Sequence, residues 1–212
     1  FLLVAKSPYL VTRPLIIDKG ATLSIQAGFV IRFKAGDNSL VVREGAIQAF
    51  GTAARPITMT SANSSPRPGD YTSAIRFEGS GQQPSVLKHI RIEYAATALY
   101  VKEGNPEISH AFIARNLQSA LECVGKSAPK ISYSTLTEHP NNAAVICSGR
   151  AQPTLYRNNI VKNAWGVINH SSLPLEAREN WWGAAQPDEA LFLGAVEYKP
   201  FLKQPEPDAV GK

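Results

Sequence analysis

A repeat between Pro84 and Gly183 constrains the fold more than any other feature of this sequence. Five prolines mark it, with successive gaps of 22, 23, 24 and 21 residues: Pro84, Pro106, Pro129, Pro153 and Pro174. After each of the first four comes an apolar β-former, at Val86, Ile108, Ile131 and Leu155. A second apolar position follows at Ile92, Ile113, Leu136 and Ile160, and a third at Leu99, Leu121, Val145 and Val167. Three short strands per repeat, with no helical stretch between them, predict one coil of a parallel β-helix.

The stretch before the repeat predicts the same architecture. Residues 7–62 read as strands of three to five residues separated by turns, and glycine stands at several of the corners. Short strands with Gly corners are what a tightly wound coil needs. A two-sheet sandwich would favour longer strands and hairpin turns such as Asn-Gly, and neither is found here.

Two long motifs at the opening and one at the ending resemble a known family. The opening reads SPYLVTRPLIIDKGATLSIQAGFVIRF and then LVVREGAIQAFGTAARPITMTSA, and the ending carries NWWG at residues 180–183. These motifs resemble the coils of bacterial right-handed parallel β-helix proteins with a pectate-lyase-like fold. The resemblance spans about residues 7–202 and implies a single all-β right-handed solenoid of roughly seven or eight coils. Many members of that group are exported, so it also implies a periplasmic, cell-surface or extracellular location.

The ends of the chain are expected to differ from the coils. Residues 1–5 are apolar but too short for an export signal, so we expect residues 1–6 to be a leader or N-terminal extension of a mature or trimmed chain. Residues 7–202 form the predicted domain, and residues 174–202 are its predicted C-terminal cap. Trp181 and Trp182 could cover the last apolar layer, or offer a platform on which sugars stack. Residues 203–212 are Pro-rich and charged, which favours a linker or disordered tail.

Composition narrows the choice of partner. The chain has a net charge of +5 and 44% hydrophobic residues, so it is a folded protein with a basic surface. No apolar run approaches the roughly 20 residues that a transmembrane helix needs. Lysine and arginine are scattered and do not interleave with aromatics, which argues against nucleic acid. An anionic polysaccharide or an acidic protein surface fits the same charge, and so does an ordinary solvated surface.

Aligned repeats stack equivalent residues into columns, because neighbouring strands lie about 4.8 Å apart. Two columns are polar and are expected to face outward. The first contains His89, His110, Tyr133 and Arg157, and the second contains Tyr94, Arg115, Glu138 and Lys162. Together they could line a shallow groove suited to a sugar carboxylate. The alternative is a solvated face on which exposed charges alternate in sign and contribute about 0–1 kcal/mol per pair.

The residue after the second column is expected to be a turn residue. It is Asn116, His139 or Asn163 in successive coils. Asparagine there can hydrogen-bond the next layer and tolerates a left-handed backbone, so we interpret His139 as a turn residue and not as a metal ligand. No histidine spacing predicts a metal site, and nothing in the sequence predicts a cofactor.

The two cysteines fall in one inward-facing column. Cys123 and Cys147 would be neighbours one layer apart, which permits a disulfide, although parallel neighbours do not give its favoured geometry. Two buried thiols that act as apolar fillers are the alternative. One polar loop, residues 61–73, leaves the coil and could carry function through Arg67, Asp70 and Tyr71.

Signatures of catalysis are missing from the coils. No Asp lies between Tyr71 and Pro187, and the carboxylates on the repeats fall in different columns. A hydrolase of this fold needs paired Asp residues, and a pectate-lyase-type site needs clustered carboxylates for Ca²⁺. We therefore assign no catalytic residue and lean against an enzyme. The favoured hypothesis is an exported scaffold or binding module for an anionic glycan or an envelope protein. The alternatives are a lyase or epimerase acting on uronic-acid polymers, with Arg115, Glu138, His110 and Tyr133 near the reaction, and a structural subunit of an envelope assembly.

Overall fold

The computed structural model is an all-β solenoid of three parallel sheets, and it describes residues 7–79, 81 and 83–209. Each coil contributes one strand to sheet A, then one to sheet B, then one to sheet C. Sheet A consists of β1 (Tyr9–Val11), β4 (Val30–Phe33), β7 (Ile57–Ser61), β10 (Ile90–Glu93), β13 (Phe112–Ala114), β16 (Thr135–Thr137) and β19 (Asn159–Val161). Sheet B consists of β2 (Leu15–Ile17), β5 (Leu40–Val42), β8 (Tyr71–Phe77), β11 (Ala95–Val101), β14 (Ser119–Cys123), β17 (Ala143–Gly149), β20 (Trp165–Ser171) and β22 (Phe192–Leu193). Sheet C consists of β3 (Thr22–Gln26), β6 (Ala46–Phe50), β9 (Val86–Lys88), β12 (Glu107–Ser109), β15 (Lys130–Ser132), β18 (Thr154–Tyr156), β21 (Leu175–Glu176) and β23 (Val196–Glu197).

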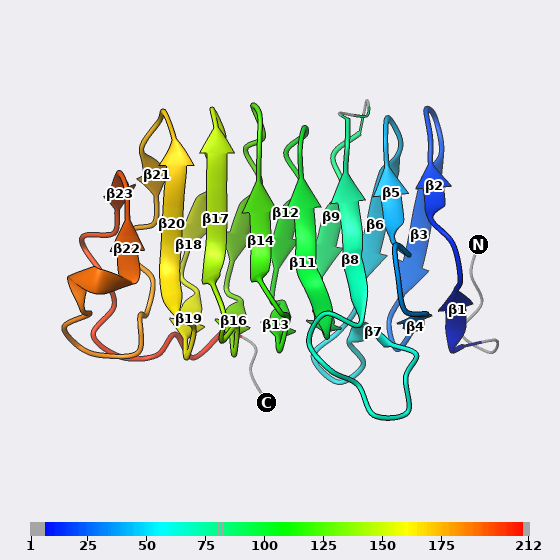
Figure 1. The fold of residues 1–212 in the computed structure, drawn as a ribbon, viewed down its shortest axis with the longest axis horizontal. Helices are drawn as coiled ribbons and strands as arrows, with labels where there is room; N and C mark the ends of the chain where they lie inside the picture. The colour runs from blue at the N-terminus through cyan, green and yellow to red at the C-terminus, as the bar shows by residue number, and fades with distance from the viewer. Residues whose placement is uncertain (1–6, 80, 82, 210–212) are drawn as a thin grey trace.

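The solenoid is right-handed. In Figure 1 the strands of sheet B rise at the front and those of sheet C descend behind them, while the chain advances from right to left. Two sheets hold eight strands and one holds seven, so the domain has about eight coils and the predicted fold class is confirmed. Within the part of the chain that the structure describes, no helix has the length and apolarity to span a membrane.

Columns of apolar side chains fill the interior. In sheet A the register pairs Ile92 with Ile113, then Leu136, then Ile160, and all four are buried. The third apolar position of the repeat forms a column in sheet B, from Leu99 to Val167, and is confirmed in the same way. Full burial of an aliphatic side chain stabilises a fold by about 1.5–3 kcal/mol, so these columns hold the coils in register.

The first repeat departs from the predicted alignment by one residue. Val86 was aligned with Ile108, but the register pairs Val86 with Glu107 and Leu87 with Ile108. Leu87 is fully buried, whereas Val86 is only half-buried. Both residues are apolar, so composition could not choose between them. The pleat does choose, because only alternate residues of a strand face the core.

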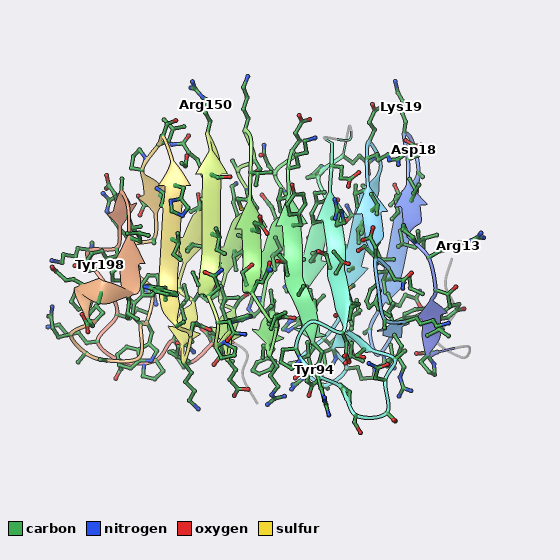
Figure 2. The ribbon with its side chains drawn as sticks, viewed as in Figure 1. Arg13, Asp18, Lys19, Tyr94, Arg150 and Tyr198 are labelled. Atoms are coloured by element: carbon green, nitrogen blue, oxygen red, sulfur yellow. The ribbon has the colours of Figure 1, made fainter. Side chains whose placement is uncertain are left out.

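The two ends of the solenoid are finished differently. At the C-terminal end Trp182 is buried and meets Phe192 edge-on, with ring centroids 4.7 Å apart. Phe192 stacks on Tyr198 in turn, and a short 3₁₀ helix, η2 (Glu189–Leu191), precedes β22. At the other end Leu10 is 57% exposed and Leu15 is 44% exposed. Figure 2 labels Tyr198 in the cap and Arg13 at the opposite end.

The start and the end of the chain were assigned to an extension and to a linker. Residues 1–6 and 210–212 lie outside the described residues. Residues 203–209 turn back along the solenoid, and Glu206 and Ala209 in this segment are buried. Figure 1 shows the segment, in red, passing below β19 and β16.

Candidate functional site

Two rows of corner residues border the outer face of sheet A. The C–A row stands where sheet C turns into sheet A, and consists of His89, His110, Tyr133 and Arg157. The A–B row stands where sheet A turns into sheet B, and consists of Tyr94, Arg115, Glu138 and Lys162. All eight have a left-handed backbone, with φ between 48° and 69°. They are the two predicted columns, and the structure places them on opposite edges of one strip, which is the outer face of sheet A.

The left-handed conformation was expected one residue later, at Asn116, His139 and Asn163. Among the described residues it falls instead on Arg115, Glu138 and Lys162. A left-handed L-residue costs about 1–2 kcal/mol, and only one residue per corner needs it to turn the chain. The following residue has then turned its side chain inward.

That inward residue builds a ladder of hydrogen bonds from coil to coil. The Ala95 amide donates to Asn116 Oδ1 at 2.9 Å, and the His139 amide donates to Asn163 Oδ1 at 3.1 Å. The His139 ring lies between its neighbours, with Nδ1 2.8 Å from Asn163 Oδ1 and Nε2 3.2 Å from Asn116 Nδ2. Because Asn163 Oδ1 can only accept, Nδ1 carries the proton and Nε2 accepts from the amide. His139 is thus a buried ladder residue that hydrogen-bonds the neighbouring coils, and the left-handed turn residue predicted there is Glu138.

Burial fixes the charge of His139 as well. Burial lowers its pKa to about 4, and the hydrogen bond with Asn163 only partly opposes this shift. A ring that is neutral and fully buried between two amides is part of the interior.

The C–A row has its own inner ladder. The Ser134 amide donates to Asn158 Oδ1 at 3.0 Å, and the Asn158 amide donates to Asn180 Oδ1 at 2.8 Å. Asn180 belongs to the NWWG motif, so this part of the motif serves the ladder. At both corners, therefore, a buried polar residue directly follows an outward-facing, left-handed residue.

Outside the ladder, the C–A row is a stack of rings. The ring centroids of His89 and His110 are 4.8 Å apart, and those of His110 and Tyr133 are 5.6 Å apart. Tyr156, just before Arg157, extends the stack edge-on from Tyr133 at 6.0 Å. Burial lowers the pKa of both histidines, and the neighbouring positive groups, Lys88 among them, act in the same direction. Near pH 7 this row is neutral except for Arg157.

The A–B row is a chain of charges. Arg115 Nη1 lies 2.6 Å from Glu93 Oε1, and Arg115 Nε lies 2.8 Å from Glu138 Oε2. Glu93 is nearly buried and also holds Arg91, whose Nε is 2.6 Å from Oε2. Partial burial opposes the charge on Arg115, but Glu138 and Glu93 outweigh it and raise its pKa. Arg115 is therefore a fixed cation and cannot serve as a base near neutral pH.

A groove runs along sheet A beside the A–B row. Its lining comes from the outward positions of the sheet A strands, from the A–B row and from the returning C-terminal segment: Arg91, Phe112, Arg115, Thr135, Thr137, Glu138, Asn159, Val161, Lys162, Trp181, Pro205 and Ala209. No residue of the C–A row is among them. The structure thus brings Arg115, Glu138 and Lys162 of the second predicted column to a groove, while Tyr94 and the whole first column lie outside its lining.

Several groove residues escaped the sequence analysis. The Arg91 guanidinium lies 4.3 Å from the centre of the Phe112 ring, and both belong to one outward column. Period-two alternation could have found them, because each directly precedes an inward isoleucine. The NWWG tryptophans separate: Trp182 caps the core, whereas Trp181 bridges to Asn159 and lines the groove.

Lys162 is the exposed cation of the groove. No carboxylate among residues 7–79, 81 and 83–209 forms an ion pair with it, whereas Arg91 and Arg115 both contact Glu93. Its charge therefore faces solvent in the groove that Trp181 also lines. An ammonium can pair with a carboxylate or sulfate, and an aromatic ring can pack against the apolar face of a sugar.

The loop candidates have different fates. Asp70 organises its own loop, since Ser61 Oγ donates to Asp70 Oδ2 at 2.6 Å and the Arg67 amide donates to it at 3.1 Å. Burial acts against its charge, but these hydrogen bonds outweigh it and lower the pKa of Asp70. Tyr71 is 1% exposed and stacks on Phe33 at 4.6 Å, which leaves it no surface for a ligand. The Arg67 side chain is exposed. Figure 2 shows Tyr94 beside this loop at the lower edge.

The cysteines are neighbours in the core. Cys123 and Cys147 are paired in register and both are free, buried thiols. Burial and a hydrogen bond with Cys147 raise the pKa of Cys123. This is the thiol alternative of the two that the sequence left open. Among the described residues, no three His, Cys, Asp or Glu side chains gather closely enough to hold a metal ion.

Comparison with known proteins gave one match. The family model described as a pectate-lyase like beta helix domain matches residues 1–83. Together with the three parallel sheets, this match confirms the predicted resemblance: the chain has a pectate-lyase-like parallel β-helix. The comparisons with curated proteins and with solved structures found no match.

Proposed function

We propose that this chain is a non-catalytic, exported module that binds an anionic polysaccharide along the groove of sheet A. The observation that carries the proposal is that Lys162, which has no ion-pair partner among the described residues, and Trp181 both line this groove. A carboxylate or sulfate on the sugar would meet the ammonium, and the apolar face of the ring would stack on the indole.

The rest of the groove suits such a ligand. Arg91 and Arg115 also line it, paired with Glu93 and Glu138, and Glu138 is the one acid among the described residues of the lining. The chain's net charge of +5 would attract a polyanion from a distance at low salt. The groove follows the solenoid axis, where positions recur about every 4.8 Å, so an extended polymer could contact several coils at once.

Catalysis is less well supported than binding. A lyase needs a base to take the α-proton, and the raised pKa of Arg115 argues against that role. Glu93 and Glu138 are already paired with arginines, which leaves little negative charge with which to hold Ca²⁺. His110 and Tyr133, the other residues considered for a reaction, lie on the opposite edge of the strip.

One experiment tests binding and catalysis together. The protein is incubated with polygalacturonate, alginate and a sulfated glycan, with and without Ca²⁺. Retardation in affinity gels and absorbance of unsaturated products are followed in parallel. We expect retardation that weakens in the variants Lys162→Ala and Trp181→Ala, with no rise in absorbance.

A matched control separates the groove from general charge. Lys130 is exposed on sheet C and pairs with Glu107, so Lys130→Ala removes the same charge far from the groove. Equal weakening by Lys130→Ala would contradict a specific groove. Rising absorbance that Arg115→Ala abolishes would favour the lyase. The absence of both retardation and product would favour an envelope protein partner or a structural subunit. Pull-downs would then be the next step.

A further inference from the structure

The C-terminal segment 203–209, here called the strap, lies on the same face as the groove. Glu206 is 4% exposed, and its Oε2 lies 3.0 Å from Arg157 Nη1. The Glu206 amide donates to Asn159 Oδ1 at 2.8 Å, and Asn159 Nδ2 donates back to the Glu206 carbonyl at 3.1 Å. Asn159 on β19 therefore binds both backbone groups of Glu206, and Arg157 binds the Glu206 carboxylate.

This contact is specific and not a chance collapse of a tail. Glu206 lies 47 residues from Asn159 and 49 residues from Arg157 in the sequence, so chain connectivity does not force them together. A two-way amide pair fixes the path of the backbone, and the carboxylate–guanidinium pair fixes which side chain sits there. Pro205 and Pro207 flank Glu206 and keep the segment extended, which lowers the entropy lost when it docks.

The strap packs on the outer face of sheet A and forms part of the groove's wall. Pro205 and Ala209 line it together with Trp181 and Lys162. A polymer that stacked on Trp181 would meet the strap there. The strap also brings its own carboxylate to this face, where Glu206 pairs with Arg157 at the edge of sheet A.

We propose that the strap is an intramolecular occupant of this face, which an anionic ligand must displace before it can use the whole groove. This inference rests on the proposed function, because it names the competitor of the same ligand. A site that is closed part of the time binds with an affinity reduced by the fraction of open molecules. If the strap is closed about nine-tenths of the time, opening it raises the apparent affinity about tenfold.

The test compares two neutralising variants of the full chain. Glu206→Gln removes the charge that Arg157 holds. Asp208→Asn removes the same charge from an exposed strap residue for which no ion pair with Arg157 is formed among the described residues, so both variants shift the net charge equally. Hydrogen exchange of the Glu206 amide reports strap docking without any ligand, because that amide donates to Asn159. Binding of labelled polygalacturonate reports access to the groove.

The outcomes separate the two proposals. We expect Glu206→Gln to speed exchange of the residue 206 amide and to tighten polygalacturonate binding about tenfold, while Asp208→Asn stays within about twofold of the unaltered chain for both. Equal tightening by both variants would assign the effect to net charge and overturn the proposed role of the strap. Unchanged polygalacturonate binding by Glu206→Gln would overturn that role as well. No binding by any variant would overturn the proposed function, and the strap's role as its competitor with it.

Discussion

The C–A row and the A–B row share a backbone and differ in what they present to solvent. Both turn the chain with one left-handed residue per coil, and both place a buried polar ladder directly behind it. The C–A row carries stacked rings and the A–B row carries paired charges. The comparison separates two tasks: the inner residue holds neighbouring coils together, and the outer residue is free to take on a function.

Breaking an inner ladder is expected to have the largest effect. Asn158 Oδ1 accepts from the Ser134 amide, and Nδ2 donates to the Ile131 carbonyl and to Asn180 Oδ1, both at 2.9 Å. Asn158→Ala leaves these buried groups unpaired, each at a cost of about 1–3 kcal/mol, so we expect a loss of about 3–5 kcal/mol. Urea unfolding measures it. Lys162→Ala, on the outer surface, should stay within about 0.5 kcal/mol, and equal losses would erase the distinction between ladder and row.

The A–B ladder should make stability depend on pH. His139 has a pKa of about 4 in the fold against an ordinary value of 6.5, so the unfolded chain binds the proton more readily. The contribution of neutral His139 to the free energy of unfolding is complete above about pH 6.5 and is lost as the pH falls towards 4. The loss amounts to about 3 kcal/mol.

His139→Asn tests this because the C–A ladder already uses asparagine at the equivalent place. Unfolding free energies of the two proteins are compared at pH 7, 5.5 and 4. The difference between them should change by about 3 kcal/mol over that range. Parallel curves would show that His139 does not control the pH dependence.

The outer rows should differ in ligand binding. Lys162→Ala in the A–B row should weaken polygalacturonate binding about fivefold, or about 1 kcal/mol, and less at high salt. Tyr133→Ala in the C–A row should change it less than about twofold, because Tyr133 does not line the groove. Titration at 50 mM and 300 mM salt measures both. A larger loss for Tyr133→Ala would move the ligand to the ring stack.

The smallest expected effect concerns the backbone that the rows share. Lys162 has φ 57°, so glycine there should be about 0.5–1 kcal/mol more stable than alanine. Tyr133→Gly relieves the backbone strain at a similar φ of 48° but removes a stacked ring, so its net effect on stability should lie near zero. Thermal unfolding of the three variants measures the contrast. If Lys162→Gly and Lys162→Ala melt together, the left-handed corner stores no strain.

Much of the site could be predicted from residue spacing. The repeat placed His110 beside Tyr133 and Arg115 beside Glu138, since strands that pair in register bring equivalent residues together. It could not show that only the A–B row lines a groove, because that depends on which way the chain turns at each corner. The prediction from the repeat also placed the left-handed residue one position too late, because Asn116 and Arg115 both stand at the same corner.

The sequence by itself determined the solenoid, its axis and its inward columns. Apolar periodicity is a local property, and it recurs in every coil. Only the tertiary structure decided that Trp181 and Trp182 point to different places, and that Glu206 docks on β19. A proline-rich charged tail has the composition of a linker. The residues that bind it, Arg157 and Asn159, are distant in the sequence, so only the folded chain brings them together.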